Sequence, residues 1–391
     1  MEAFSNWFWQ DYFWLPQGVS FRDLKDRPGF VYAKPRDLFY VPVVGLGIYF
    51  VRIIYERFIA LPLAKRFGVS DGKERKPAQP NKQLEEYFNF KSKHPTEAEI
   101  DGLSKQLDWS TLAIKRWFRR KRNLSRPSLQ TKFCEASWRC MFYTLVFTFG
   151  MGTLWQTPWF WDNLQCWVDY PRQSVEQSTY IYYMLEASFY VSLLFTVMQD
   201  VKRKDFKVQL IHHVATLFLI GFSYAANFVR AGTLVMAVHD ISDIFLEGAK
   251  CFIYIKWNNF ADTLFIFFAL SFLISRLVIF PFWIIHTTYI KSMWLFDPYP
   301  GYYFFNALLM VLQVLHIFWS YLILRMAFFM VTAGKVRVEK DDRSDVEEVS
   351  TDEDTPNHEQ NSINHDKKST MQNDNHTATK NGPTTKAKHR K

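Results

Sequence analysis

The sequence predicts an all-α, polytopic membrane protein with about seven transmembrane helices that enclose a central cavity. Apolar runs close to the ~20 residues that a spanning helix needs recur between residues 38 and 331. Hydrophobic residues make up 49% of the chain and aromatic residues 18%. Residues 341–391 contain no Phe, Trp or Tyr, so the mean hydropathy of −0.14 averages an apolar body with a polar tail.

We expect residues 1–37 to form a lumenal or interfacial N-terminal segment. It lacks a basic stretch and a small-residue cleavage site, so it does not have the form of a cleaved signal peptide. Its aromatic cluster fits a short helix at the membrane interface. An ordinarily packed terminus is the alternative. The aromatic residues are Trp7, Phe8, Trp9, Tyr12, Phe13 and Trp14.

The first transmembrane helix is predicted at 38–62, and a cytosolic segment rich in Lys and Arg follows at 63–132. Within that segment, residues 81–124 have the pattern of three short helices. Thr96 begins a capping-box sequence, TEAE, at the start of the second helix. Ser110 follows a turn and can cap the third helix. The segment therefore contains a small helical module.

This module resembles the later part of a homeodomain, because it ends in WFRRKRN where that family has a WFxNRR pattern. Arg120 stands where the family has its adenine-reading Asn, and the N-terminal arm and much of the first helix are missing. We therefore expect no DNA partner. The interpretation we prefer is a tethered cytosolic module whose basic face meets anionic lipid.

Residues 133–332 are predicted to form a six-helix membrane domain. Arg276 lies inside one of its spans and needs a partner there. His316 lies in the last span, where a lone histidine indicates packing more readily than chemistry. The six predicted spans are 138–160, 180–198, 206–226, 231–255, 260–286 and 303–331.

Lys and Arg gather in the loops that follow the first, third, fifth and seventh spans. This pattern predicts a lumenal N-terminus and a cytosolic C-terminus. Residues 333–391 are expected to be a disordered cytosolic tail. Ser344, Ser350 and Thr351 each precede an acidic residue by three positions and are candidate phosphorylation sites. The four cysteines form no CxxC pair, so we expect neither a disulfide framework nor a metal knuckle.

The fourth and fifth spans carry ionisable residues in an apolar setting, where such groups are costly. At 100° per residue, the polar residues of each span fall on one face. Two such faces should turn toward each other and place imidazoles beside carboxylates in a dry cavity. The alternative is that they only hold the bundle together. The residues are Gln209, His212, Thr216 and Ser223 on one span, and Asp240, Asp243, Glu247 and Lys250, bordered by His239, on the other.

The same stretch resembles the Lag1 motif of ceramide synthases, within the TRAM-Lag1-CLN8 membrane domain. The degenerate homeodomain is typical of most animal members of that family. The matching residues are Asp205-Phe206, Ile211-His212-His213, Phe222-Ser223-Tyr224, Asn227, Arg230-x-Gly232-Thr233, His239-Asp240, Asp243, Glu247 and Ala249-Lys250.

The resemblance implies N-acylation of a sphingoid base by a fatty acyl-CoA at the endoplasmic reticulum membrane. The products would be ceramide or dihydroceramide and free CoA. Acyl-CoA is a substrate in this reaction, so we expect no cofactor and no metal. The resemblance also implies homodimers or heterodimers with related synthases. The loop at 289–299 influences acyl length in this family, but its sequence does not translate into a chain length.

For this chemistry we expect His212 to take either the acyl group or the amine proton, because a neutral imidazole can act as nucleophile or base. His213, turned by 100°, would orient or donate to the thioester oxygen. Asp243 would orient His212 and stabilise its charged form. Asp240 and His239 would contact the sphingoid amine or support the others. Covalent acyl-histidine and direct general-base transfer both stay open.

Further residues are expected to bind substrate or to stabilise the bundle. Gln209, Thr216, Ser223, Asn227 and Arg230 are the candidate substrate contacts. Glu247 and Lys250 are expected to form a structural pair. The basic residues at the mouth of the fourth span can hold the phosphates of CoA, or can serve only to set topology. They are Lys202, Arg203, Lys204 and Lys207.

Two rival functions fit parts of the pattern. A di-iron lipid hydroxylase also keeps histidines near the membrane surface, but it needs several HxxHH-type clusters, and this chain has one pair plus His239. A non-catalytic relative, acting as a lipid sensor or translocation accessory, would not need His212, His213 and Asp243 together. An assay with acyl-CoA and sphinganine separates these functions.

Overall fold

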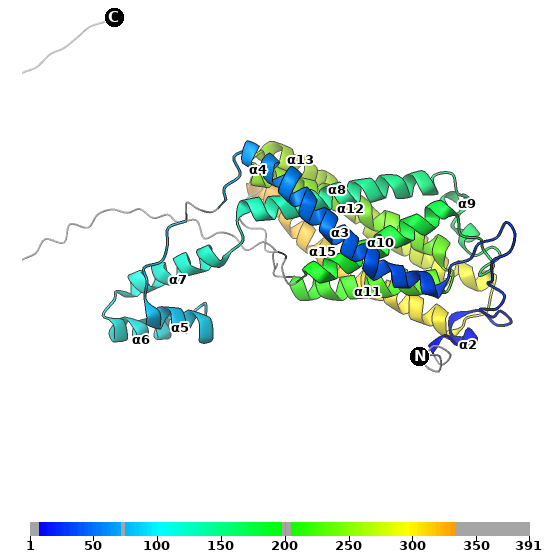
Figure 1. The fold of residues 1–391 in the computed structure, drawn as a ribbon, viewed down its shortest axis with the longest axis horizontal. Coiled ribbons are helices and arrows are strands. Elements are labelled where there is room, and N and C mark those ends of the chain that lie inside the picture. The colour runs from blue at the N-terminus through cyan, green and yellow to red at the C-terminus, as the bar shows by residue number, and fades with distance from the viewer. Residues whose placement is uncertain (1–7, 72–74, 198–199, 201–204, 334–391) are drawn as a thin grey trace, which may run out of the picture. The chain divides into compact units, whose positions relative to one another are not determined.

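The computed structural model describes residues 8–71, 75–197, 200 and 205–333, which form helices joined by loops and, apart from an isolated bridge between Arg27 and Phe30, contain no β-structure. The all-α prediction is therefore confirmed for the described part of the chain. Its long helical segments lie side by side in a bundle (Figure 1). They are α3 (Tyr40–Tyr55), continued by η2 (Glu56–Ala60) and α4 (Leu61–Arg66), then α8 (Leu129–Leu154), α10 (Gln177–Thr196), α11 (Phe206–Ala225), α12 (Val229–Tyr254), α13 (Asn258–Leu273), continued by η4 (Ile274–Ile285) and α14 (His286–Tyr289), and α15 (Pro300–Ala333).

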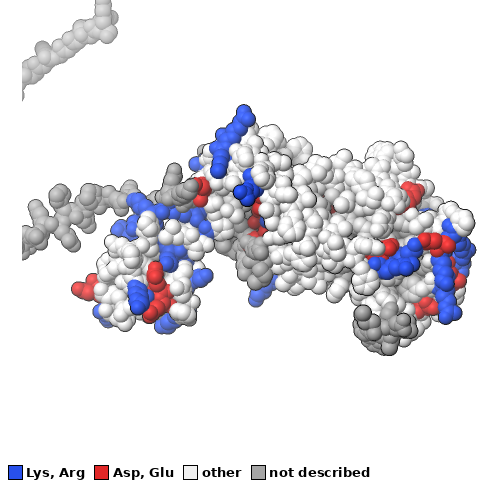
Figure 2. All heavy atoms as spheres, viewed as in Figure 1, with Lys and Arg blue, Asp and Glu red and all other residues white. Residues whose placement is uncertain are grey.

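Four segments of the described chain are long and apolar enough to cross a membrane: Pro35–Arg66, Phe206–Ala225, Asn258–Trp294 and Pro300–Thr332. The other long helices, α8, α10 and α12, carry more polar residues and pack against one another inside the bundle. Large apolar side chains are exposed along α3, among them Val43, Phe50 and Ile54. Figure 2 shows few charged residues over the middle of the bundle on the face in view. The chain is thus a multi-pass membrane protein, and the count of seven spans stays a prediction.

The predicted span limits are close to the observed helices, with one large displacement at α8. This helix begins at Leu129, nine residues before the predicted span at 138–160, and ends at Leu154. The Ser128 side chain accepts a hydrogen bond from the Thr131 backbone N–H and caps its start. Hydropathy did not find this start because the first turns of α8 are polar.

The N-terminal segment is packed against the bundle. Trp14 is 3% exposed and stacks on Phe222 of α11, with ring centroids 4.9 Å apart. It also meets Phe304 of α15 edge to face. The helix in this segment, α2 (Asp11–Trp14), is one turn long. These contacts correspond to the packed terminus that was the alternative to an interfacial helix.

The module within 81–124 consists of α5 (Lys82–Phe90), α6 (Glu97–Leu107) and α7 (Thr111–Ser125) around its own hydrophobic cluster. The predicted capping box at Thr96 is confirmed, with Glu99 as its reciprocal partner. Ser110 caps α7 as predicted, accepting from the Ala113 backbone N–H. The relation of this module to homeodomains stays a prediction.

The remaining short elements connect the long helices. They are η1 (Pro35–Phe39), α9 (Pro158–Trp161), η3 (Asn163–Cys166) and η5 (Lys291–Trp294). The segment η4 is π-helical and contains Pro281, which has no backbone N–H to donate. This wider turn carries Arg276, 3% exposed, into the bundle.

Candidate active site

Two adjoining voids lie between the helices of the bundle. The polar chamber has a cavity volume of about 100 Å³, and Gln209, His212, His213, Asp243 and Arg276 are among its lining residues. The apolar cavity has a volume of about 50 Å³ and is lined mainly by apolar side chains of α10, α11, α12 and α15. Tyr190 of α10 lines both voids, so they meet there.

His212 and His213 enter the polar chamber from α11, and each is 8% exposed. The His212 ring packs edge to face on Trp319 of α15, with centroids 5.4 Å apart, and stacks at 6.2 Å against His239 of α12. The Nδ1 atoms of His212 and His213 have no hydrogen-bond partner among the described residues. Buried polar atoms are normally paired, so these two buried nitrogens lack the partner that such atoms usually have.

Asp243 lies in the same chamber and is bound to Arg276. The Arg276 Nη2 atom donates to Asp243 Oδ1 at 3.2 Å, to Ser242 Oγ at 2.9 Å and to the His239 carbonyl at 2.7 Å. Asp243 is therefore the partner that Arg276 was predicted to need inside its span. The hydrogen bonds described for Asp243 include Arg276 but not His212, so the expected support of His212 by Asp243 stays a prediction.

His239 is fixed by two hydrogen bonds. Its Nδ1 atom lies 2.6 Å from the Val235 carbonyl oxygen, and its Nε2 lies 3.0 Å from Nε2 of His316. A carbonyl oxygen only accepts, so Nδ1 of His239 carries the proton. In the neutral ring Nε2 then accepts a hydrogen bond from His316. His316 packs among Phe272 and Phe280, as expected, and it also sets the orientation of His239.

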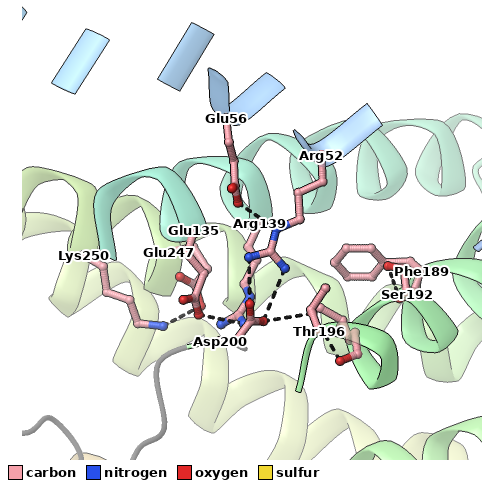
Figure 3. A network of polar contacts seen from close by, with 11 residues as sticks. Arg52, Glu56, Glu135, Arg139, Phe189, Ser192, Thr196, Asp200, Glu247 and Lys250 are labelled. Atoms are coloured by element: carbon pink, nitrogen blue, oxygen red, sulfur yellow. Dashed lines mark hydrogen bonds and ion pairs between the residues drawn. The ribbon is translucent and has the colours of Figure 1, made fainter. Parts of the chain in front are cut away.

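A network of charged side chains borders the polar chamber (Figure 3). Arg139 of α8 lines the chamber and forms ion pairs with Glu135 at 2.8 Å and with Asp200 at 2.7 Å. Arg52 of α3 binds the same Asp200 at 2.7 Å. The predicted structural pair of Glu247 and Lys250 is present in the network. The pairs of Arg52 and Arg139 tie α3 and α8 to Asp200, beyond the end of α10, whereas the Glu247–Lys250 pair lies within α12.

Sequence reasoning missed two charged residues of the site, Arg139 and Glu186. Glu186 of α10 is 1% exposed, lines the apolar cavity and is hydrogen-bonded to Asp240. Asp240 also accepts a hydrogen bond from Tyr182 Oη at 3.5 Å. Arg139 and Glu186 could have been identified from the sequence, because each is an ionisable residue inside a predicted apolar span.

The predicted substrate contacts are distributed over several places. Gln209 lines the polar chamber, whereas Thr216 and Ser223 line the apolar cavity. Asn227 donates to the carbonyls of Pro171 and Gln173, and Arg230 donates to the carbonyl of Gln165. Neither Asn227 nor Arg230 lines either void, so both hold the connecting loops in this structure.

Of the basic residues expected to hold CoA phosphates, Lys207 is exposed on the first turn of α11. Lys202, Arg203 and Lys204 lie outside the described residues, as do the candidate phosphorylation sites Ser344, Ser350 and Thr351. Within the described part of the chain, no three His, Cys, Asp or Glu side chains are grouped so that they could hold a metal ion.

Comparison with known proteins gives a consistent result. Residues 132–325 match the TLC domain of the TRAM, LAG1 and CLN8 proteins. The chain is 46% identical to ceramide synthase 5 of Homo sapiens over 350 residues, 89% of this chain and 88% of the relative. It is 44% identical to ceramide synthase 4 of Bos taurus over 349 residues, 89% and 88% of the two chains. It is 31% identical to ceramide synthase hyl-1 of Caenorhabditis elegans over 353 residues, 87% and 84% of the two chains. The chain therefore belongs to the ceramide synthases, within the TLC-domain family of membrane proteins.

Proposed function

We propose that this chain is a sphingoid base N-acyltransferase, which transfers a fatty acyl group from acyl-CoA to sphinganine or sphingosine. The observation that carries the proposal is the polar chamber that holds His212, His213 and Asp243 next to an apolar cavity. A thioester in the chamber would meet an imidazole, while its alkyl chain would enter the cavity. A sensor without catalysis would not need these three side chains together.

In this proposal His212 either accepts the acyl group or removes the amine proton. Its place in the wall of the polar chamber and its packing against Trp319 support the assignment, since the ring is held in place where a substrate would lie. His213 would donate to or orient the thioester oxygen. Asp243, held by Arg276, would stabilise positive charge that develops on His212 across the chamber.

We place the chain in the endoplasmic reticulum membrane with a lumenal N-terminus, a cytosolic C-terminus and the polar chamber in the cytosolic half of the bilayer. This placement rests on the Lys and Arg of the loops. Acyl-CoA would then enter from the cytosol, and Arg139 joins Lys207 as a candidate partner for its phosphates because it lines the chamber. Dimers with a second copy or a related synthase are part of the same proposal.

The test is to incubate the purified chain in lipid nanodiscs with sphinganine and acyl-CoAs of graded length, and to measure ceramide by mass spectrometry. We expect ceramide with the wild-type chain and a loss of about 10²–10⁴-fold per folded molecule with Asp243→Ala. No ceramide with any acyl-CoA would favour the non-catalytic function. The intact mass of the chain after exposure to acyl-CoA alone separates the two routes, because only the covalent one leaves an acyl adduct.

A further inference from the structure

Glu186 and Asp240 form a buried carboxyl pair that the proposed roles of His212, His213 and Asp243 do not use. Both side chains are 1% exposed and line the apolar cavity from α10 and α12. They are hydrogen-bonded to each other. Two carboxyl groups can form such a bond only if at least one of them carries a proton, so the pair carries at most one negative charge.

The pair has no cationic partner in the described structure. None of the described Lys and Arg side chains forms an ion pair with Glu186 or Asp240, and the nearby Arg276 is bound to Asp243. The Oε1 atom of Glu186 has no hydrogen-bond donor among the described residues. A negative charge in a low-dielectric interior is costly unless a cation joins it. The arrangement therefore fits a site that is completed by a positively charged ligand.

The pair lies where the two voids meet. Glu186 is one helical turn before Tyr190, which lines both of them. Asp240 follows His239, whose ring lies 6.2 Å from that of His212. A ligand held by the two carboxyls would be adjacent to the imidazole that faces the thioester.

We propose that Glu186, together with Asp240, binds the ammonium group of the long-chain amine substrate and sets the preference of the enzyme for an amine. This inference rests on the proposed function and adds to it a recognition residue on α10. An ammonium group matches the net charge of the pair and supplies the donor that Glu186 Oε1 lacks. The rings of Tyr182 and Tyr190 add aromatic surface beside it, which suits a cation.

The test compares sphinganine with octadecane-1,3-diol, which keeps the chain and hydroxyls but lacks the amine. In the wild-type chain we expect the inhibition constant of the diol to exceed the KM for sphinganine by about tenfold or more. Glu186→Gln keeps the shape and one hydrogen bond but removes the charge. It should raise the KM for sphinganine by about tenfold. The KM for acyl-CoA and the inhibition constant of the diol should stay within about twofold of their wild-type values. The discrimination between sphinganine and the diol would then be abolished.

Glu176→Gln is the matched control, because Glu176 caps the same helix and is exposed. It should leave all three constants unchanged. Glu186→Asp should recover part of the discrimination. Equal binding of sphinganine and the diol by the wild-type chain would overturn the proposal, even if Glu186→Gln failed to fold. Unchanged discrimination in a folded, active Glu186→Gln variant would also overturn it. Absence of ceramide formation by the wild-type chain would instead refute the proposed function.

Discussion

The contact between the buried Arg276 and the partly exposed Asp243 gives a quantitative prediction. Arg276→Met removes a cation that is 3% exposed and donates to three oxygen atoms, on Asp243, Ser242 and the His239 carbonyl. The variant leaves the Asp243 carboxylate, whose side chain is 22% exposed in the polar chamber, without its cation. Removing one partner of a fully buried ion pair costs about 3–5 kcal/mol, and because Asp243 is partly exposed we expect a smaller loss in the free energy of unfolding, about 1–3 kcal/mol.

A second substitution isolates the charge effect. In Arg276→Met with Asp243→Leu, the uncompensated carboxylate is gone, although Ser242 and the His239 carbonyl still lack a donor. We expect the double variant to be more stable than Arg276→Met, with a coupling energy of about 1–3 kcal/mol. Exposed Arg325 on α15 offers a control, since Arg325→Met should change stability by no more than about 0.5 kcal/mol.

The assay is reversible unfolding of the purified chain in mixed micelles, followed by the fluorescence of its tryptophans. The free energies of unfolding of the wild type, both single variants and the double variant form a double-mutant cycle, which gives the coupling energy between Arg276 and Asp243. A loss of less than about 0.5 kcal/mol in Arg276→Met would refute the reasoning, because Asp243, Ser242 and the His239 carbonyl would then lose their common donor at almost no cost in free energy. A double variant no more stable than Arg276→Met would refute it as well.

Three further predictions follow from other parts of the structure. Gly232→Ala should destabilise the chain by about 1–3 kcal/mol, because its Cβ would lie 1.6 Å from Tyr183 Oη, and Tyr183→Phe should relieve part of that loss in an unfolding measurement. Phe305→Ala should shift the preference toward longer acyl-CoAs in a competition assay, because Phe305 packs on Phe228 with centroids 4.5 Å apart and both line the apolar cavity; unchanged preference would contradict this. In the module, the hydrogen bond from the Thr96 backbone N–H lowers the pKa of Glu99 from 4.5 to about 2, so its stabilising effect is full above pH 4.5 and is lost as the pH falls through about 2. Hydrogen exchange of the first turn of α6 should rise over that range in the wild-type chain but not in Glu99→Gln.

Much of the fold was predictable because it depends on local rules. Apolar runs predicted the long helices, and the caps at Thr96 and Ser110 follow from side-chain chemistry within one turn. The helix α8 begins nine residues before the predicted span at 138–160, because its first turns are polar and hydropathy does not detect them. Where a helix ends in a membrane protein depends on which of its terminal residues the neighbouring helices cover.

The site was predictable only in part. Helical spacing placed Gln209, His212, Thr216 and Ser223 on one face, and in the structure that face passes from the polar chamber into the apolar cavity. The pairing of Arg276 with Asp243, and of Glu186 with Asp240, joins residues more than 30 positions apart. Such pairs are fixed by how the helices pack against one another. The periodicity along one helix does not predict that packing.

The central claim is that the imidazole of His212 carries the acyl transfer inside the polar chamber. The most direct measurement is the rate of ceramide formation by His212→Ala in nanodiscs. The variant used must have an unfolding transition that matches that of the wild-type chain. The account predicts a loss of about a thousandfold or more, since neither His213 nor His239 can take its place against Trp319. A folded His212→Ala chain that forms ceramide at close to the wild-type rate would contradict it.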